Sequence, residues 1–333
     1  MNYSFFGTCY EDYHLLIDCL KSMANQTLPA NEIILIDSSK KGEILKYINK
    51  LFENSSTVIK YENINLPRVK ALNLAISKAN SDYLLRFDSR TRFSENYAET
   101  SIKILKKTNK YKIILGNIGG KQNAIPANNS LNAKLAADLF NRAYVFGNPL
   151  YRRENYSGKV NSIYLGCYPK EIIKQTLFRE DINLISEDSQ ICQDIIAKGY
   201  EIHISKFLSI KYLCRENFYL VIKLLRSYGR CRARTIISTR VIHDNKKYLL
   251  ILFMVVISPI LLFYFFKNIL LALILVFLIP LSYNVFHEYR NYGLKKIYYL
   301  PLLALCLQLS WILGLFETLI LYKFTRNKNS NFL

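Results

Sequence analysis

The chain has 333 residues, enough for one large domain with an appendage or for two modest domains. Its formal net charge of +20 calls for an anionic partner such as nucleic acid, anionic lipid or a phosphorylated substrate. The seven cysteines are scattered and lack metal-binding spacing, which favours reduced thiols in a cytosolic setting over a disulfide framework. We expect no signal peptide, because the first residues carry neither a basic segment nor a long apolar one.

Strands and helices are expected to alternate along the first ninety residues. The expected strands are 3–10, 32–36, 58–61 and 83–87, and the expected helices between them are 14–23, 42–52 and 67–79. The second strand is apolar throughout, which favours a parallel sheet covered by helices on both faces. Asp37 and Asp88 follow two of these strands, so both acids are predicted at the edge of the sheet where ligands collect.

The stretch SDYLLRFDSRTRF, residues 81–93, carries the most informative of these acids. Asp88 stands where an apolar strand ends, and an acid there can hold a divalent cation through its oxygens. The alternative is that Asp88 and Ser89 only begin a turn, which both residue types do well.

Two runs resemble family 2 glycosyltransferases, including polysaccharide-type members such as the succinoglycan biosynthesis glycosyltransferases. These runs are CLKSMANQTLP with NEIILIDSS, within 19–39, and KALNLAISKANSDYLLRFDSR, residues 70–90. The resemblance extends over roughly the first 235 residues. It implies an α/β GT-A fold, a mostly parallel Rossmann-like sheet, for residues 1–215. It also implies a nucleotide-sugar donor, with a UDP-sugar as the expected one.

The resemblance assigns roles to residues that follow the first strands. The implied nucleoside-binding residues are Thr8, Tyr10, Glu11 and Asp37. Asp88 takes the first position of the family's Asp-x-Asp motif and is the implied ligand of Mg²⁺ or Mn²⁺. The third position is Arg90, so one acid remains for the cation. Arg90 either sets its guanidinium against the donor diphosphate, which its planar fork suits, or is a solvated surface arginine.

An acidic pair, Glu187-Asp188, precedes an expected helix that ends at Gly199. Acids at a helix start are common caps, which is the structural alternative. In the family an equivalent pair provides the catalytic base, so Asp188 is the implied base. The implied acceptor-side residues are Glu187, Gly166, Cys167, Arg152 and Arg153. The alternative for the region around these arginines is a surface hairpin with ordinary charges.

The middle of the chain is expected to hold a helix at 95–108, a strand at 111–115 and a helix at 131–146. The segment 116–132 between them contains Gly119-Gly120, Pro126 and several asparagines, and is predicted to be a long loop.

Residues 216–247 carry eight Lys or Arg against two acids and intersperse them with apolar residues. This pattern is typical of an interfacial segment lying on anionic membrane lipids. Arg230, Arg232 and Arg234 stand where family relatives carry a basic loop, so they are candidates to contact the donor diphosphate or the acceptor's lipid phosphate. The alternative is contact with lipid headgroups alone. The Gln-x-x-Arg-Trp sequence of chain-elongating synthases is not found here, which puts processive synthesis in doubt.

Residues 248–322 are predicted to form a transmembrane region of two to three helices, followed by a tail at 323–333. The apolar runs are 248–266, 269–286 and 297–322, each near the roughly 20 residues that cross a bilayer. The basic flank before Tyr248 belongs on the cytoplasmic side. A third full span would put the basic tail outside, so the number of spans stays open. Glu317 in the last run is either functional or interfacial.

These expectations combine into a metal-dependent, inverting glycosyltransferase of EC class 2.4 in the bacterial inner (plasma) membrane, with a cytoplasmic catalytic domain. The implied acceptor is a polyprenyl-diphosphate-linked saccharide in cell-surface polysaccharide synthesis. A polyprenyl-phosphate glycosyltransferase of the dolichyl-phosphate mannose synthase type is an alternative. Another is a non-catalytic, basic membrane-bound binding protein. No nucleic-acid partner is expected, because no signature with stacking aromatics is recognisable. The sequence leaves the sugar, the linkage and the oligomeric state open.

Overall fold

The computed structural model describes residues 1–109, 113–180, 186–239, 260, 263, 264, 269–294, 297 and 299–325. The chain divides into two compact units. Unit 1 comprises Met1–Ala127 with Leu150–Cys214, and unit 2 comprises Asn128–Pro149 with Arg215–Leu333. The first expected apolar run, 248–266, lies outside the described residues apart from positions 260, 263 and 264, and most of the expected tail also lies outside them.

Unit 1 is built on one mixed sheet. Its strands are β1 (Tyr3–Cys9), β2 (Glu32–Asp37), β3 (Val58–Asn63), β4 (Tyr83–Arg86), β5 (Thr91–Phe93), β6 (Leu115–Ile125), β7 (Gly158–Lys159), β8 (Gly166–Pro169) and β9 (Glu201–Leu213). The strand order is β3-β2-β1-β4-β8-β6-β9-β5, and β7 pairs with β9. Strands β1 to β4 run parallel to one another, whereas β8 is antiparallel to both of its neighbours.

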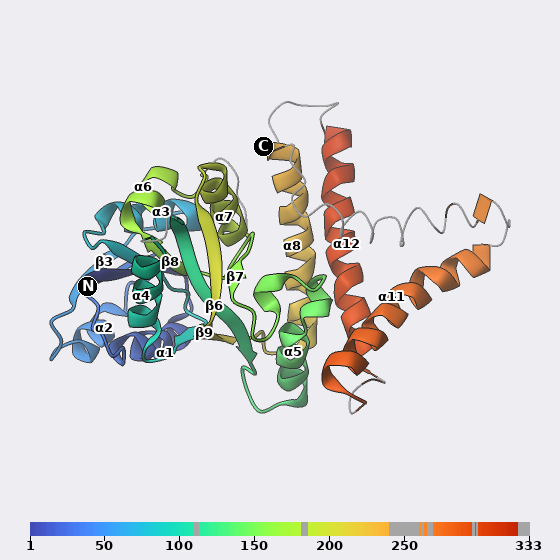
Figure 1. Cartoon of the computed structure of the whole chain (residues 1–333), viewed down its shortest axis with the longest axis horizontal. Helices are drawn as coiled ribbons and strands as arrows, with labels where there is room; N and C mark the ends of the chain where they lie inside the picture. The colour runs from blue at the N-terminus through green and yellow to red at the C-terminus, as the bar shows by residue number, and fades with distance from the viewer. Residues whose placement is uncertain are drawn as a thin grey trace. The chain divides into compact units, whose positions relative to one another are not determined.

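Helices cover both faces of this sheet, as predicted. They are α1 (Tyr13–Ala24), α2 (Leu45–Leu51), α3 (Arg68–Lys78), α4 (Tyr97–Asn109), α6 (Lys170–Thr176) and α7 (Glu187–Ala197), with a 3₁₀ turn η2 (Leu150–Arg152). Because side chains alternate along a strand, Phe5 joins the core under α1, α2 and α4, and Phe6 joins the core under α3, α6 and α7. Figure 1 shows α3, α6 and α7 above the sheet and α1 and α2 below it.

The strand order reverses direction between β1 and β4. The chain builds outward from β1 through β2 to β3, and α3 then returns it to β4 on the opposite side of β1. The carboxyl ends of β1 and β4 therefore meet at a topological switch point, where open α/β sheets bind their ligands.

The predicted loop at 116–132 was wrong, because most of it forms β6 (Leu115–Ile125). Its glycines serve close packing within the sheet. A Cβ on Gly120 would lie 2.3 Å from the carbonyl oxygen of Leu208 in β9, and the pairing with β9 shifts register beside it. Glycine is therefore required at this strand position. The prediction failed because glycine-rich composition is also typical of loops.

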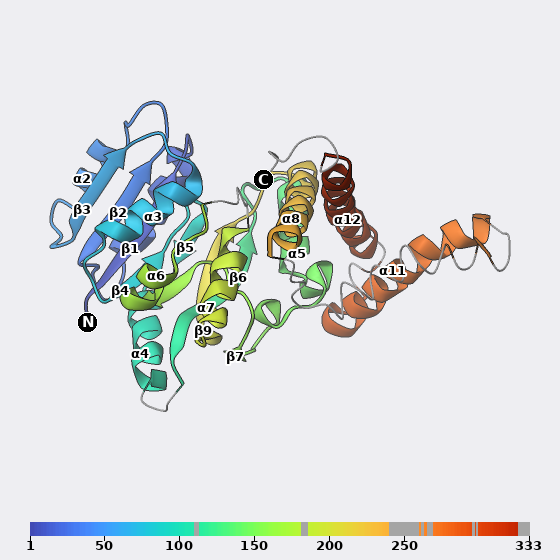
Figure 2. The same cartoon turned by 90° about the horizontal axis from the view of Figure 1, so that it is seen from above.

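Unit 2 is helical. Its elements are α5 (Leu131–Asn141), a 3₁₀ turn η1 (Ala143–Phe146), α8 (Phe218–Thr239), α11 (Ile269–Tyr292) and α12 (Leu300–Thr325). Helices α8 and α12 lie side by side in both views (Figure 1, Figure 2). Among the described residues, Leu300–Tyr322 is the stretch long and apolar enough to cross a membrane, with mean hydropathy 1.8.

Two sets of polar contacts tie unit 2 together. Glu317 of α12 accepts hydrogen bonds from Arg230 (2.9 Å) and Arg226 (3.1 Å) of α8. Glu288 of α11 is buried and accepts from Arg142 (3.2 Å) and from the hydroxyl of Tyr144 (3.0 Å). The segment 128–149, which we expected inside the first domain, thus contributes partners to a carboxyl-terminal helix.

The close approach of α8 and α12 predicts the effect of adding a methyl group between them. A Cβ on Gly229 would lie 2.0 Å from the carbonyl oxygen of Trp311. We expect Gly229→Ala to lower stability by about 1–3 kcal/mol, because the helix backbones would have to separate. Thermal unfolding in detergent measures this, with Ser227→Ala as the control on the same helix. A stabilised Gly229→Ala protein would contradict the packing, since alanine is otherwise the better helix former.

Candidate active site

The residues after β1 meet the residues after β2 at the same edge of the sheet. Cys9 pairs with Asp37 in the β1–β2 register. The backbone N–H of Glu11 donates to the hydroxyl of Ser39 (2.8 Å), and its carboxylate accepts from the N–H of Lys40 (3.0 Å). Glu11 adopts a positive φ of 52°, which only a few non-glycine residues do. The two loops are thus fixed to each other.

The predicted nucleoside-binding residues come together here. Tyr10 is 61 % exposed and stands beside Glu11, and Thr8 lies at the end of β1. Asp37, by contrast, is completely buried, and one of its oxygens accepts from the hydroxyls of Tyr61 (2.7 Å) and Tyr13 (2.8 Å). Burial alone would raise the pKa of Asp37, but its hydrogen bonds hold that pKa below the usual range. Asp37 is therefore an ionised anchor for the surrounding loops.

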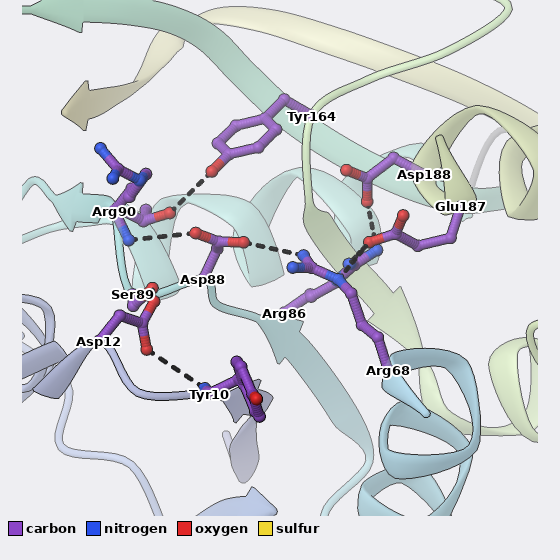
Figure 3. A network of polar contacts seen from close by, with 11 residues as sticks. Tyr10, Asp12, Arg68, Arg86, Asp88, Ser89, Arg90, Tyr164, Glu187 and Asp188 are labelled. Carbon is purple, nitrogen blue, oxygen red and sulfur yellow. Dashed lines mark hydrogen bonds and ion pairs between the residues drawn. The ribbon is translucent and has the colours of Figure 1, made fainter. Parts of the chain in front are cut away.

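Asp88 follows β4 and has both of its oxygens engaged. Oδ1 accepts from the backbone N–H of Arg90 (3.1 Å), and Oδ2 accepts from Nη2 of Arg68 (2.8 Å; Figure 3). Burial would raise the pKa of Asp88, but the charge and hydrogen bond of Arg68 outweigh it and lower the pKa. Asp88 is thus a carboxylate at the switch point.

A chain of alternating charges runs from Asp88 to Asp188 (Figure 3). Nε of Arg68 donates to Glu187 (2.8 Å), and Nη2 of Arg86 donates to the same oxygen (2.5 Å). The other end of Arg86 hydrogen-bonds to Asp188. The order is therefore Asp88, Arg68, Glu187, Arg86 and Asp188, and it connects β4, the first residue of α3 and the first turn of α7.

Arg86 is the fully buried arginine of this charge chain. Its side chain has no exposed surface, and its guanidinium lies 5.0 Å from the ring centroid of Phe178. An arginine so deeply buried is retained only where carboxylates compensate its charge. Arg86 therefore fixes the positions of the acidic pair at the start of α7.

The same surroundings shift the two acids of the pair in opposite directions. Burial would raise the pKa of Glu187, but the charges of Arg68 and Arg86 prevail and lower it. For Asp188 burial is the largest effect, and it raises the pKa. The charges of Glu187 and Asp88 raise the pKa further and the charge of Arg86 lowers it, and the net result is a pKa of about 6. A carboxylate with such a pKa can accept a proton near neutral pH.

Asp12 and Tyr164 also line the neighbourhood of Asp88. Asp12 accepts a hydrogen bond from the hydroxyl of Ser89, and burial, with the charge of Asp88, raises its pKa. The hydroxyls of Tyr164 and Thr91 lie 3.1 Å apart. The contact with Ser89 holds the turn that follows Asp88 against the loop after β1, and the contact with Thr91 holds the start of β5 beside Tyr164.

Arg90 lies beside Asp88 in sequence, but its side chain points to a strand end. Its guanidinium donates to the carbonyls of Leu213 (3.3 Å) and Cys214 (3.2 Å), where β9 ends. It thus ties down the carboxyl end of β9, while only its backbone N–H contacts Asp88.

The other predicted residues lie in separate places. Gly166 and Cys167 are buried in β8, and a Cβ on Gly166 would lie 2.0 Å from Oδ1 of Asn117. Arg152 donates to Gln122 of β6 (3.2 Å), and Arg153 is exposed just after η2. Arg230, Arg232 and Arg234 belong to α8 of unit 2, where Arg230 is held by Glu317. No disulfide joins the seven cysteines, all of which lie within the described residues.

Sequence reasoning missed Arg68 and Arg86, although each carries a signal. Arg86 is a charged residue within an otherwise apolar strand. Arg68 is the first residue of α3, where the helix dipole disfavours a positive charge. A basic residue in either position indicates a specific acidic partner.

The ligands available at Asp88 suit a cation that is bound jointly by the protein and by a substrate. Among the described residues there is no group of three or more His, Cys, Asp or Glu side chains that could hold a metal ion by itself. Magnesium, however, is commonly bound by one or two carboxylates together with substrate phosphates and waters. Asp88 fits that pattern, whereas the described residues around it do not form a complete metal site by themselves.

The fold is that of glycosyltransferases with the GT-A fold. Mannosyltransferase PcManGT from Pyrobaculum calidifontis, solved with GDP-Man and Mn²⁺, matches with a TM-score of 0.60 at 13 % identity, over 96 % of this chain and 87 % of that chain. This likeness establishes the fold. Residues 4–169 match the model of Glycosyl transferase family 2. The protein therefore belongs to glycosyltransferase family 2 through this domain, and it is a glycosyltransferase.

Two further proteins are similar to this chain. The poly-beta-1,6-N-acetyl-D-glucosamine synthase of Staphylococcus epidermidis is 23 % identical over 221 residues, which are 66 % of this chain and 50 % of the relative. The chain thus matches about half the length of this curated relative. TarS 1-349 of S. aureus, solved in complex with UDP-GlcNAc, is 12 % identical, and the match covers 98 % of this chain and 92 % of that chain. Its TM-score is 0.48, and we base no conclusion on it.

The buried position of Arg86 predicts a large loss of stability in Arg86→Met. We expect the free energy of unfolding in detergent to fall by about 3–5 kcal/mol, because Glu187 and Asp188 lose the cation that both contact. The loss should grow from pH 5 to pH 8, since Glu187 and Asp188 must then ionise without Arg86. Arg179→Met is the control, because Arg179 pairs with Asp194 of α7 and is 41 % exposed. Equal losses in the two variants would contradict this role of Arg86.

Proposed function

We propose that this glycosyltransferase transfers a sugar, with inversion, from a nucleoside diphosphate sugar to a hydroxyl of a lipid-linked saccharide. The observation that carries the proposal is Asp188, a carboxylate with a pKa raised to about 6 that the charge chain holds in the same network as Asp88. A general base and a diphosphate-facing acid in one network are what an in-line displacement at an anomeric carbon requires.

In this mechanism Asp188 removes the proton from the acceptor hydroxyl as its oxygen attacks the anomeric carbon. The bond from that carbon to the donor's phosphate oxygen breaks, and the nucleoside diphosphate leaves with the electron pair. General bases of this kind typically contribute about 10²–10⁴-fold. Arg86 orients Asp188 and keeps its carboxylate toward the charge chain. The loops around Tyr10, Glu11 and Asp37 hold the nucleoside.

The leaving diphosphate needs positive charge beside it. Asp88 would hold Mg²⁺ or Mn²⁺, which would neutralise the diphosphate. The solved mannosyltransferase with this fold contains GDP-Man and Mn²⁺, which supports a divalent cation here. A UDP-sugar remains the proposed donor.

The acceptor is proposed to be a polyprenyl-diphosphate-linked saccharide in cell-surface polysaccharide assembly at the bacterial inner membrane. The apolar helix α12 and the basic residues of α8 support a membrane-bound enzyme that contacts anionic lipids, with its catalytic unit on the cytoplasmic side. The similarity to a polysaccharide synthase supports the pathway. A membrane-bound acceptor would be confined to the surface on which the enzyme acts.

Asp188→Asn tests the proposed base. We expect turnover to fall by at least about 10²-fold, because the acceptor hydroxyl loses its proton acceptor, while donor binding is retained. The assay uses full-length protein, Mn²⁺, a panel of UDP- and GDP-sugars and a polyprenyl-diphosphate-linked sugar, with thermal shift reporting donor binding. Asp194→Asn on the same helix is the control. If most of the rate survives in Asp188→Asn, the acceptor is already an anion, as in polyprenyl-phosphate transferases.

The raised pKa of Asp188 predicts the pH dependence of the reaction. The base acts when it is deprotonated, so kcat/KM should be constant above about pH 6 and fall about tenfold for each pH unit below it. Initial rates between pH 5 and pH 8 at low donor concentration measure this, with donor affinity followed over the same range. A profile that is flat down to pH 5 would exclude Asp188 as the base.

A further inference from the structure

Arg68 joins the acid that faces the donor to the acid beside the base. Its Nη2 lies 2.8 Å from Oδ2 of Asp88, and its Nε lies 2.8 Å from Oε1 of Glu187 (Figure 3). The side chain of Arg68 is 50 % exposed, whereas that of Glu187 is 5 % exposed. One end of the guanidinium therefore lies on a buried carboxylate, and the other lies on Asp88, whose side chain is 18 % exposed.

The side chain of Arg68 hydrogen-bonds to Glu187 and to Asp88. Arg68 begins α3, where the helix dipole repels a positive charge. Its contact with Asp88 engages the oxygen that the backbone N–H of Arg90 leaves open. A divalent cation bound to that oxygen would stand within a few ångströms of the guanidinium, and like charges at such a distance repel strongly.

A nucleoside diphosphate would remove this conflict. Its phosphate oxygens offer negative charge to both cations, and the planar fork of a guanidinium matches phosphate oxygens well. The Nη end of Arg68 could turn toward the phosphates while Nε stays on Glu187.

We propose that Arg68 competes with the divalent cation for Asp88, and that it turns to the donor's phosphate oxygens when cation and nucleoside diphosphate bind together. This inference rests on the function proposed above and adds Arg68 to the donor-binding residues. It makes the binding of cation and nucleotide cooperative, and such coupling is reciprocal. In the absence of nucleotide, Arg68 keeps cation affinity low.

The test measures Mn²⁺ binding to the full-length protein in detergent, by the electron paramagnetic resonance signal of free Mn²⁺, with and without UDP or GDP. We expect Arg68→Gln to bind Mn²⁺ about tenfold more tightly than wild type without nucleotide, and to gain about tenfold less from added nucleotide. The double variant Arg68→Gln, Asp88→Asn should lose the gain, which assigns it to Asp88. Arg179→Gln, which removes an arginine from another ion pair of unit 1, should behave as wild type.

Arg68→Lys separates charge from shape, because it keeps a cation beside Asp88 and should bind Mn²⁺ as weakly as wild type. Unchanged Mn²⁺ affinity in a folded Arg68→Gln protein overturns the proposal, and so does an equal gain in Arg68→Lys. If neither UDP nor GDP binds any variant, the proposed function and the phosphate contact both fail, but a Mn²⁺ gain that Asp88→Asn removes still supports the competition. If nucleotide binds and transfer proceeds while Arg68→Gln leaves Mn²⁺ binding unchanged, only the role of Arg68 fails.

Discussion

The ion pairs of the buried Arg86 determine how the site is put together. Arg86 lies in β4, two residues before Asp88, and its guanidinium contacts both Glu187 and Asp188 at the start of α7. The same residue therefore connects the strand that delivers one acid with the helix that delivers two others. Since Arg86 is completely shielded from water, its charge can be accommodated only while both acids stay in place. The geometry of the acids and the folding of unit 1 are thus linked.

The charge chain also gives its carboxylates different affinities for protons. Asp88 and Glu187 each contact Arg68, and both stay ionised because their pKa values are lowered. Asp188 shares Arg86 with Glu187 and is largely shielded from water, and its pKa is raised. Residues of one chemical type are in this way suited to the different tasks that we propose for them: holding charge against a diphosphate, fixing the arginines and accepting a proton.

Much of the parallel half of the sheet follows from local sequence. Short, mostly apolar runs predict β1 to β4, and the acids after β2 and β4 must emerge at one edge because parallel strands point the same way. The acidic pair at α7 was identified by resemblance to a family. The contacts of Arg68 and Arg86 with Glu187 join residues 119 and 101 positions apart, and no local pattern encodes such distances. Strand β6 was not predicted for a related reason. Its glycines are required by close contacts with residues that are distant in the sequence.

The segment 128–149 lies in the middle of the transferase sequence but belongs to the helical unit. The chain consequently passes from one unit to the other after residues 127, 149 and 214. A truncation at 215 would strip Arg142 and Tyr144 of Glu288 and leave the apolar side of α5 without the helices of its own unit. The carboxyl-terminal helices are therefore part of the fold of unit 2 and cannot be removed without exposing it. A fragment that ends before them would keep α5 and η1 without the helices that pack against these elements, so we expect it to aggregate.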